Sequence, residues 1–206
     1  MPKTKPFDEN SSEYDRWYIE NKNIYDSELN ALQIFIPPGL HGVDIGVGTG
    51  RFAKALCIAT GVEPSHCMAE IARSRGIKVL DGIAENLPMG NAEFDFALMI
   101  TAICFFDDVK KAFKEAYRVL KSDGFLVVAF IDKESKLGRL YEKHKQDSEF
   151  YKDATFYSVK EVTDFLIVGG FKNFEYRQTI YSLENIPHVV EPGYGLGSFI
   201  VVKATK

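Results

Sequence analysis

The fold is decided by residues 43–50, which read Val43-Asp44-Ile45-Gly46-Val47-Gly48-Thr49-Gly50. A short apolar run leads into three glycines, and a helical pattern follows them. Glycines at alternating positions let the backbone turn tightly and come close to a ligand, because no Cβ atom stands in the way. A strand, a glycine turn and a helix in this order predict the first unit of a ligand-binding α/β sheet.

Outward from this turn, short apolar runs alternate with amphipathic stretches. The apolar runs predict buried parallel strands at residues 42–45, 60–63, 77–80, 94–100 and 125–131. One helix is predicted over 109–120, where apolar residues recur at helical spacing. Another begins near Ser158, which forms a capping box with Glu161, and ends at Gly169 and Gly170. Strands that alternate with helices indicate an α/β sheet covered on both faces.

Two more strands are predicted near the end of the chain, at 174–181 and 198–204. About sixteen residues separate them, and Pro187 and Pro192 would interrupt any helix there. A parallel crossover needs a dozen or more residues and usually a helix, so we expect an antiparallel closing pair. The sheet is then mostly parallel, with seven strands and one of them reversed.

Two segments rich in aromatic residues stand outside this alternation. Residues 7–36 predict one or two helices that form an N-terminal cap. Residues 133–157 form an insertion after the fifth strand, which would serve as a substrate lid. Neither segment is large enough to fold alone, so residues 1–206 are expected to form a single domain.

The glycine turn alone leaves more than one ligand open. Read from Gly48, the spacing Gly48-x-Gly50-x-x-Ala53 fits a dinucleotide fingerprint, so an NAD(P)-dependent oxidoreductase stays an alternative. A P-loop is excluded, because no Gly-Lys-Ser/Thr follows the turn. Glu63 ends the second strand, where a carboxylate would accept hydrogen bonds from the two hydroxyls of a ribose.

Together these residues resemble the class I S-adenosylmethionine-dependent methyltransferases, in particular the small-molecule enzymes of the methyltransferase type 11 group. The first motif of that family, an acidic residue followed by Gly-x-Gly-x-Gly, matches Asp44 and the three glycines, and Glu63 resembles its ribose-binding acid. Segments 81–88, 94–96 and 116–124 are similar to further family motifs. The resemblance covers residues 40–131 and implies a Rossmann-like three-layer sandwich with strand order 3-2-1-4-5-7-6 and the last strand antiparallel.

S-Adenosylmethionine is the cofactor that this resemblance implies. The residues expected to bind it are Asp44, Gly46, Gly48, Gly50, Glu63, Pro64, Ala84, Glu85 and Thr101. Where many relatives carry an aspartate that accepts from the adenine amino group, this chain has Ile83. The adenine would then be held by backbone groups at Ala84, by Glu85 or by apolar packing.

The methyl acceptor is expected to approach from the edge of the fourth and fifth strands. The residues expected to line its pocket are Tyr14, Trp17, Tyr18, Cys104, Phe105 and Tyr141. No motif names a catalytic base, so the catalytic residue is unknown and the candidates are His144 and Tyr14. An apolar, aromatic pocket suits a small, partly hydrophobic acceptor. Since an amine needs no base and a carbon acid usually needs one, methylation at nitrogen or oxygen is expected rather than at carbon.

Composition narrows the range of partners. The chain has 206 residues and a net charge of −4, from 25 Lys and Arg against 29 Asp and Glu, which disfavours a nucleic-acid partner. Cys57, Cys67 and Cys104 are irregularly spaced and form neither a disulfide framework nor a metal clip, so no metal is expected. The start of the chain lacks a signal peptide and no run is long enough to span a bilayer. We therefore expect a cytoplasmic protein that binds no membrane. The sequence does not predict its oligomeric state.

Three hypotheses follow for the function. The leading one is methyl transfer from S-adenosylmethionine to a small molecule by in-line displacement. The second is an oxidoreductase that uses NAD(P), and the third is a non-catalytic binding protein that keeps the methyltransferase fold.

Overall fold

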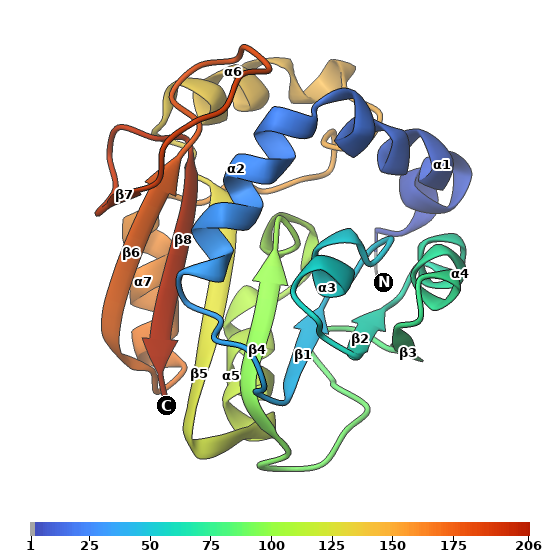
Figure 1. Ribbon diagram of the computed structural model, residues 1–206, viewed down its shortest axis with the longest axis vertical. Coiled ribbons are helices and arrows are strands. Elements are labelled where there is room, and N and C mark those ends of the chain that lie inside the picture. Colours follow the sequence, from blue (N-terminus) through green and yellow to red (C-terminus); the bar gives the residue numbers. More distant parts are fainter. Residues whose placement is uncertain (1–2) are drawn as a thin grey trace.

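Eight strands form one sheet in the described part of the chain, residues 3–206 of a computed structural model (Figure 1). The order of the strands across the sheet is β3-β2-β1-β4-β5-β8-β6-β7. The strands are β1 (Gly42–Ile45), β2 (Thr60–Glu63), β3 (Lys78–Asp81), β4 (Phe94–Ile100), β5 (Leu120–Ile131), β6 (Lys172–Thr179), β7 (Glu191–Pro192) and β8 (Phe199–Thr205).

The pairing of these strands confirms the predicted α/β class and the predicted topology. β1 to β5 pair in parallel, and β8 pairs antiparallel with both β5 and β6. The seven predicted strands therefore stand in the predicted order, with the last one reversed. The short β7 is an addition, because two residues between the closing strands pair with Arg177 and Gln178 at the outer edge of β6.

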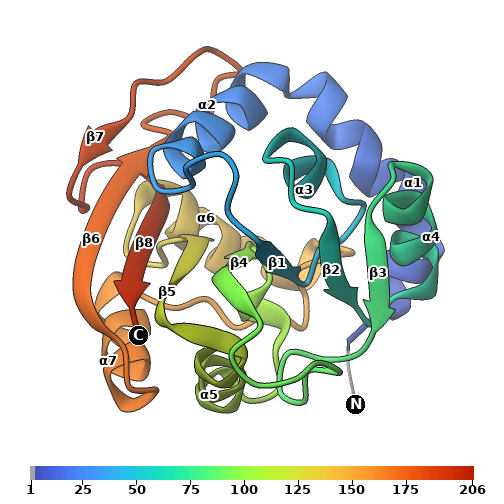
Figure 2. The ribbon, with the colours of Figure 1, turned by 60° about the horizontal axis from the view of Figure 1, so that its bottom comes forward.

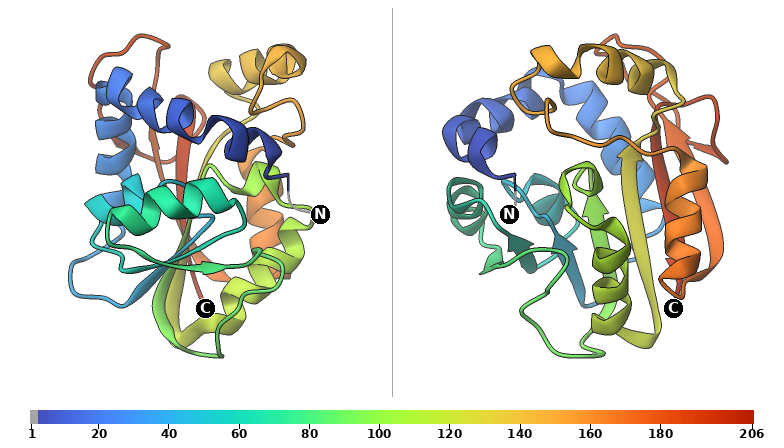
Figure 3. Two further views of the ribbon diagram at one scale, coloured as in Figure 1. Left: turned by 90° about the vertical axis from the view of Figure 1, so that its right-hand side faces the viewer. Right: turned by 180° about the vertical axis from the view of Figure 1, so that it is seen from behind.

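Helices cover both faces of the sheet, which gives three layers (Figure 3). α5 (Val109–Val119) and α7 (Val159–Val168) pack on one face, and α2 (Lys22–Gln33), α3 (Arg51–Ala55) and α4 (His66–Ser74) pack on the other. α7 begins with the predicted capping box between Ser158 and Glu161 and ends at Gly169. β5 begins at Leu120 rather than Phe125, because the buried Leu120 already pairs with Phe94 directly after α5.

The two segments outside the alternation lie over the end of the sheet toward which β1 and β4 point (Figure 1). The first consists of α1 (Lys5–Glu20) and α2, and α1 lies beside α4 (Figure 2). The second contains α6 (Lys136–His144) and a short 3₁₀ turn, η2 (Lys145–Asp147). A further 3₁₀ turn, η1 (Ile103–Phe105), follows β4. No helix within residues 3–206 combines the length and the apolar character needed to cross a membrane.

Candidate active site

Gly46 and Gly48, in the glycine turn between β1 and α3, line a pocket with their backbone atoms. The φ angles of Gly46, Gly48 and Gly50 are +80°, +55° and +77°, a region in which a residue with a Cβ atom is strained. A Cβ at Gly46 would also lie 2.8 Å from the Cβ of Ala102. At Gly48 the nearest atom to such a Cβ, Met68 Cε, is 3.9 Å away, so the space beside it is open to a ligand.

Glu63 at the end of β2 holds this turn in place. Its Oε2 accepts a hydrogen bond from the backbone N–H of Gly48 at 2.8 Å, and its Oε1 accepts one from Ser65 at 2.9 Å. Burial raises the pKa of Glu63 to about 7, although these two hydrogen bonds oppose the rise. Each carboxylate oxygen has two lone pairs, so Glu63 keeps acceptor capacity toward the pocket that it lines.

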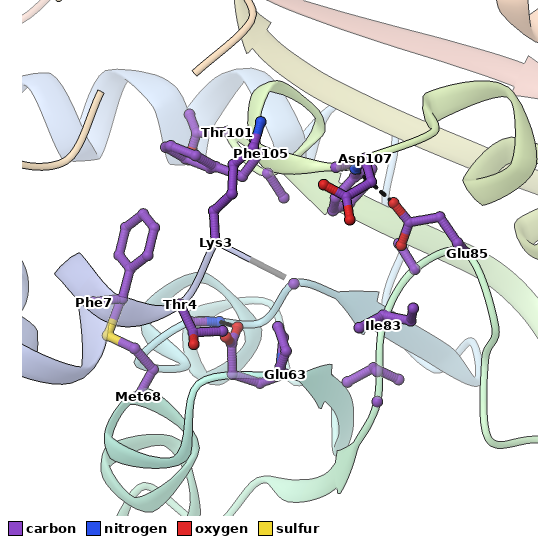
Figure 4. A pocket seen from close by; sticks show the side chains of 18 of the residues that line it. Lys3, Thr4, Phe7, Glu63, Met68, Ile83, Glu85, Thr101, Phe105 and Asp107 are labelled. Carbon is purple, nitrogen blue, oxygen red and sulfur yellow. Dashed lines mark hydrogen bonds between the residues drawn. The ribbon is translucent and has the colours of Figure 1, made fainter. Parts of the chain in front are cut away.

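The pocket in front of the turn, called the cofactor pocket below, collects most of the predicted cofactor residues (Figure 4). Those that line it are Gly46, Gly48, Glu63, Pro64, Ala84, Glu85 and Thr101. Lys3, Thr4 and Phe7 also line it, and Phe7 stands across the pocket from Ile83 and Glu85 (Figure 4). Sequence reasoning missed this N-terminal wall, because no motif marks it.

The loop after β3 forms the wall opposite Phe7. Ile83 and Ala84 are apolar members of this wall. Glu85 accepts hydrogen bonds through Oε1 from the backbone N–H groups of Asp107 and Asp108, at 2.8 and 3.1 Å. Glu85 thus also fixes the loop to the start of α5, in addition to lining the pocket.

Asp44 and Gly50 do not line the cofactor pocket. Asp44 lines a second, smaller pocket together with Tyr14 and Tyr18, and its Oδ1 has no hydrogen-bond partner among the described residues. Burial, followed by the charge of Glu63, raises the pKa of Asp44 to about 8. A buried acceptor without a donor is rare, so this carboxylate suits a ligand that brings a cation or an N–H group. Gly50 instead allows close packing, since a Cβ there would lie 3.0 Å from Ala72.

A larger cavity of about 430 Å³, the aromatic chamber, lies between the N-terminal cap and the insertion. Six aromatic side chains line it: Tyr14, Trp17, Tyr18, Tyr141, Phe150 and Tyr151. Tyr14 and Thr101 line both the chamber and the cofactor pocket, so the two cavities adjoin at these residues. Thr101 holds a φ of +47°, a strained conformation of the kind that concentrates at functional sites.

The structure sorts the predicted acceptor residues into two groups. Tyr14, Trp17, Tyr18 and Tyr141 line the chamber. Cys104 and Phe105 do not: Phe105 lines the cofactor pocket, and Cys104 packs against Ala154 and Phe156. Burial raises the pKa of the Cys104 thiol to about 12, so it stays protonated. These two residues were predicted for the acceptor pocket because they follow β4, but the η1 turn carries them away from the chamber.

The two candidate bases differ in position, because Tyr14 lines both cavities and His144 lines neither. His144 is exposed at the end of α6 and lines none of the pockets described here. The phenol of Tyr14 lies 3.0 Å from the hydroxyl of Tyr18, and burial raises its pKa to about 12. Tyr14 therefore stays protonated near neutral pH and can orient an acceptor without removing its proton.

Glu28 lines the aromatic chamber and was not predicted from the sequence. It is 6% exposed and lines the aromatic chamber, and burial raises its pKa to about 8. The signal for it was present, because Glu28 shares the inward face of α2 with Ile24, Ala31 and Leu32, four before and three and four after it. A carboxylate in such an apolar stripe indicates either a buried partner or a ligand.

By fold and by sequence, the chain belongs to the class I S-adenosylmethionine-dependent methyltransferases. A family model described as a methyltransferase domain matches residues 43–128. The uncharacterized protein MJ1123 of Methanocaldococcus jannaschii is 48% identical over 202 residues, which cover 97% of this chain and 98% of that protein.

Two further relatives extend this comparison. A solved structure from Thermotoga maritima, described as a S-adenosylmethionine-dependent methyltransferase and possible histamine N-methyltransferase, is 49% identical with a TM-score of 0.95. The match covers 98% of this chain and 99% of the Thermotoga chain. The uncharacterized protein Rv2003c of Mycobacterium tuberculosis is 32% identical over 188 residues, and the match covers 88% of this chain but 65% of that protein.

Proposed function

We propose that this protein transfers a methyl group from S-adenosylmethionine to a nitrogen or oxygen atom of a small molecule. The observation that carries the proposal is the junction of the cofactor pocket with the aromatic chamber at Tyr14 and Thr101. A chamber of about 430 Å³ lies within the usual range of small-molecule sites, roughly 300–1,000 Å³.

The residues of the cofactor pocket, and of the smaller pocket that shares Gly46 and Gly48 with it, fit S-adenosylmethionine. Glu63 offers acceptor capacity to ribose hydroxyls, and the unpartnered Oδ1 of Asp44 would receive the ammonium group of the methionine part. Gly46 and Gly48 leave room for the ligand that a side chain would take. When bound, S-adenosylmethionine supplies an electrophilic methyl group on a sulfonium cation.

The protein's own contribution is to hold and align the acceptor. Alignment of reacting groups can supply a large share of the rate without a base, provided that the nucleophile arrives with a free lone pair. Neither Tyr14 nor His144 is a suitable base, which favours a neutral amine or imidazole nitrogen over a hydroxyl. The description of the Thermotoga relative as a possible histamine N-methyltransferase supports nitrogen as well.

Two measurements test the proposal. Titration calorimetry with S-adenosylhomocysteine and with NAD separates the methyltransferase from the oxidoreductase, and we expect only the first ligand to bind. Transfer of a labelled methyl group to a panel of small acceptors that includes histamine then separates an enzyme from a non-catalytic binding protein. Binding of NAD alone, or no labelled product from any acceptor, would overturn the proposal.

A further inference from the structure

We propose that Glu28 and the tyrosines around it bind a cationic group of the acceptor, which makes the substrate class small amines with a positive charge remote from the methylated atom. This inference rests on the proposed methyl transfer and adds to it the chemistry that selects the acceptor. Glu28 lies outside the motifs that bind the cofactor, on the inner face of α2.

Glu28 is a buried carboxylate without a partner. It is 6% exposed, and no described residue donates a hydrogen bond to it. No neighbouring cation contributes to its pKa, which burial alone raises. By contrast, the exposed side of the same helix pairs Asp26 with Lys22. Burial of an unpaired carboxylate costs folding free energy, which is why Glu28 holds a proton up to about pH 8 in the absence of a partner. A cationic ligand would provide the missing partner and stabilise the ionised form.

The carboxyl groups that line the chamber give it a negative character. The carboxylates of Glu13 and Glu20 also line it, both on exposed parts of α1. Among the described lining residues there is no lysine, arginine or histidine. An anionic acceptor would therefore be repelled from this cavity, whereas a cation would be drawn into it.

The aromatic side chains around Glu28 add a second attraction for a cation. Tyr14, Tyr18, Tyr141 and Tyr151 line the same chamber as Glu28. The charge of Glu28 is one of the smaller causes, after burial, that raise the pKa values of these four phenols. The rings of Tyr141 and Tyr151 stack with centroids 5.1 Å apart, and those of Tyr14 and Tyr18 pack edge to face at 5.6 Å. Aromatic faces attract ammonium groups, most strongly where water is excluded.

The anchored ammonium cannot itself be methylated, because its nitrogen has no free lone pair. The chamber meets the cofactor pocket at Tyr14 and Thr101, so a second, neutral nitrogen or oxygen of the acceptor is the atom that lies toward the methyl donor. That atom forms the new bond to the methyl carbon with its lone pair, the carbon–sulfur bond breaks toward sulfur, and a proton of the acceptor leaves to water.

Binding measurements on matched pairs of ligands test this inference. Each pair consists of a small ring-bearing amine and the alcohol of the same shape, for example tyramine with tyrosol and 2-phenylethylamine with 2-phenylethanol. Calorimetry is run at pH 8.5, above the pKa of Glu28 and below that of the amines, on the full chain saturated with S-adenosylhomocysteine, for wild type, Glu28→Gln and the control Asp26→Asn. The control removes the same charge from the exposed side of the same helix.

We expect at least one amine to bind about tenfold or more tightly than its alcohol, a preference worth roughly 1.4 kcal/mol. Glu28→Gln should abolish this preference while its affinity for S-adenosylhomocysteine stays unchanged, and Asp26→Asn should keep both. Equal binding of amines and alcohols throughout, or a preference that persists in Glu28→Gln, would overturn the inference. Failure of wild type to bind S-adenosylhomocysteine would instead overturn the proposed function.

Discussion

Asp15 in α1 accepts two hydrogen bonds from the guanidinium of Arg51 at the start of α3, at 2.8 Å from Nε and 2.6 Å from Nη2. Arg75 donates to the same carboxylate at 2.8 Å and to the carbonyl oxygen of Thr49 in the glycine turn at 2.5 Å. The helix that supplies Tyr14 and Tyr18 to the aromatic chamber is thereby fixed to the turn that faces the cofactor.

The first prediction concerns this link and its dependence on pH. Burial acts to raise the pKa of Asp15, but the hydrogen bonds from Arg51 and Arg75 prevail and lower it to about 2. A lowered pKa stabilises the folded state above the ordinary value of 3.8, and this contribution is lost as the pH falls toward 2.

Asp15→Asn should therefore lower the free energy of unfolding at pH 7 by an amount on the order of 1–2 kcal/mol. The difference from wild type should shrink as the pH falls from about 4 toward 2. Urea unfolding of wild type and Asp15→Asn at pH 7 and at pH 3 measures the two free energies of unfolding. If their difference is the same at both pH values, the ion pairs of Asp15 contribute nothing to stability.

The second prediction is that Glu28 lowers the folding stability of the protein at alkaline pH. Burial raises its pKa from 4.5 to about 8, so the folded state holds a proton that the unfolded state releases, and stability falls as the pH rises from about 4.5 to 8. Glu28→Gln should raise the melting temperature at pH 8 by several degrees, at roughly 2–4 °C per kcal/mol, and change little at pH 5.

Scanning calorimetry at pH 5 and pH 8 checks this prediction. Asp44 and Glu63 also have raised pKa values, so wild type and variant share their contribution and only the difference between the two proteins is informative. A Glu28→Gln protein that melts below wild type at pH 8 would mean that the carboxylate has a stabilising partner.

The third prediction concerns the residues that bind the cofactor. Glu63→Ala removes the acceptor offered to the ribose and frees the Gly48 N–H, so affinity for S-adenosylhomocysteine should fall by about tenfold or more. Gly48→Val forces a branched side chain onto a φ of +55° beside the pocket and should weaken binding as well. Calorimetry on both folded variants tests this, and an unchanged affinity in Glu63→Ala would remove that residue from the site.

The fourth prediction separates orientation from base catalysis. Because the Tyr14 phenol stays protonated, Tyr14→Phe should change kcat only a few-fold, whereas loss of a true base costs about 10²–10⁴-fold. Tyr14→Ala should raise KM for the acceptor, since the ring that lines both cavities is lost. His144→Ala should leave both constants unchanged. A loss of several hundred-fold in Tyr14→Phe would restore Tyr14 as the base.

The sequence predicted the parts of the site that local rules determine. Gly46 and Gly48 are required by a tight turn with positive φ angles, and Glu63 stands at a fixed place on the next strand, so their meeting follows from the order of the strands. The chamber could not be predicted in this way. It depends on how α1 and α2 face the insertion. Contacts between residues far apart in the sequence set this arrangement, such as the hydrogen bond that Asn10 Nδ2 donates to Glu149 Oε1 at 2.7 Å.

The same limit explains the residues that were misplaced or missed. His144 and Tyr141 lie three residues apart on α6, yet Tyr141 lines the chamber and His144 is exposed. Lys3 reaches the cofactor pocket and donates to the carbonyl oxygen of Asp153 at 2.9 Å, a contact for which no pattern in the sequence exists.

The central claim is tested most directly by transfer of a labelled methyl group from S-adenosylmethionine into a cell extract that has been divided by size. The predicted result is label in the small-molecule fraction, in products that bind a cation exchanger, and no label with the Glu63→Ala protein. Label confined to the macromolecular fraction, or label in small molecules that Glu63→Ala forms equally well, would contradict the account.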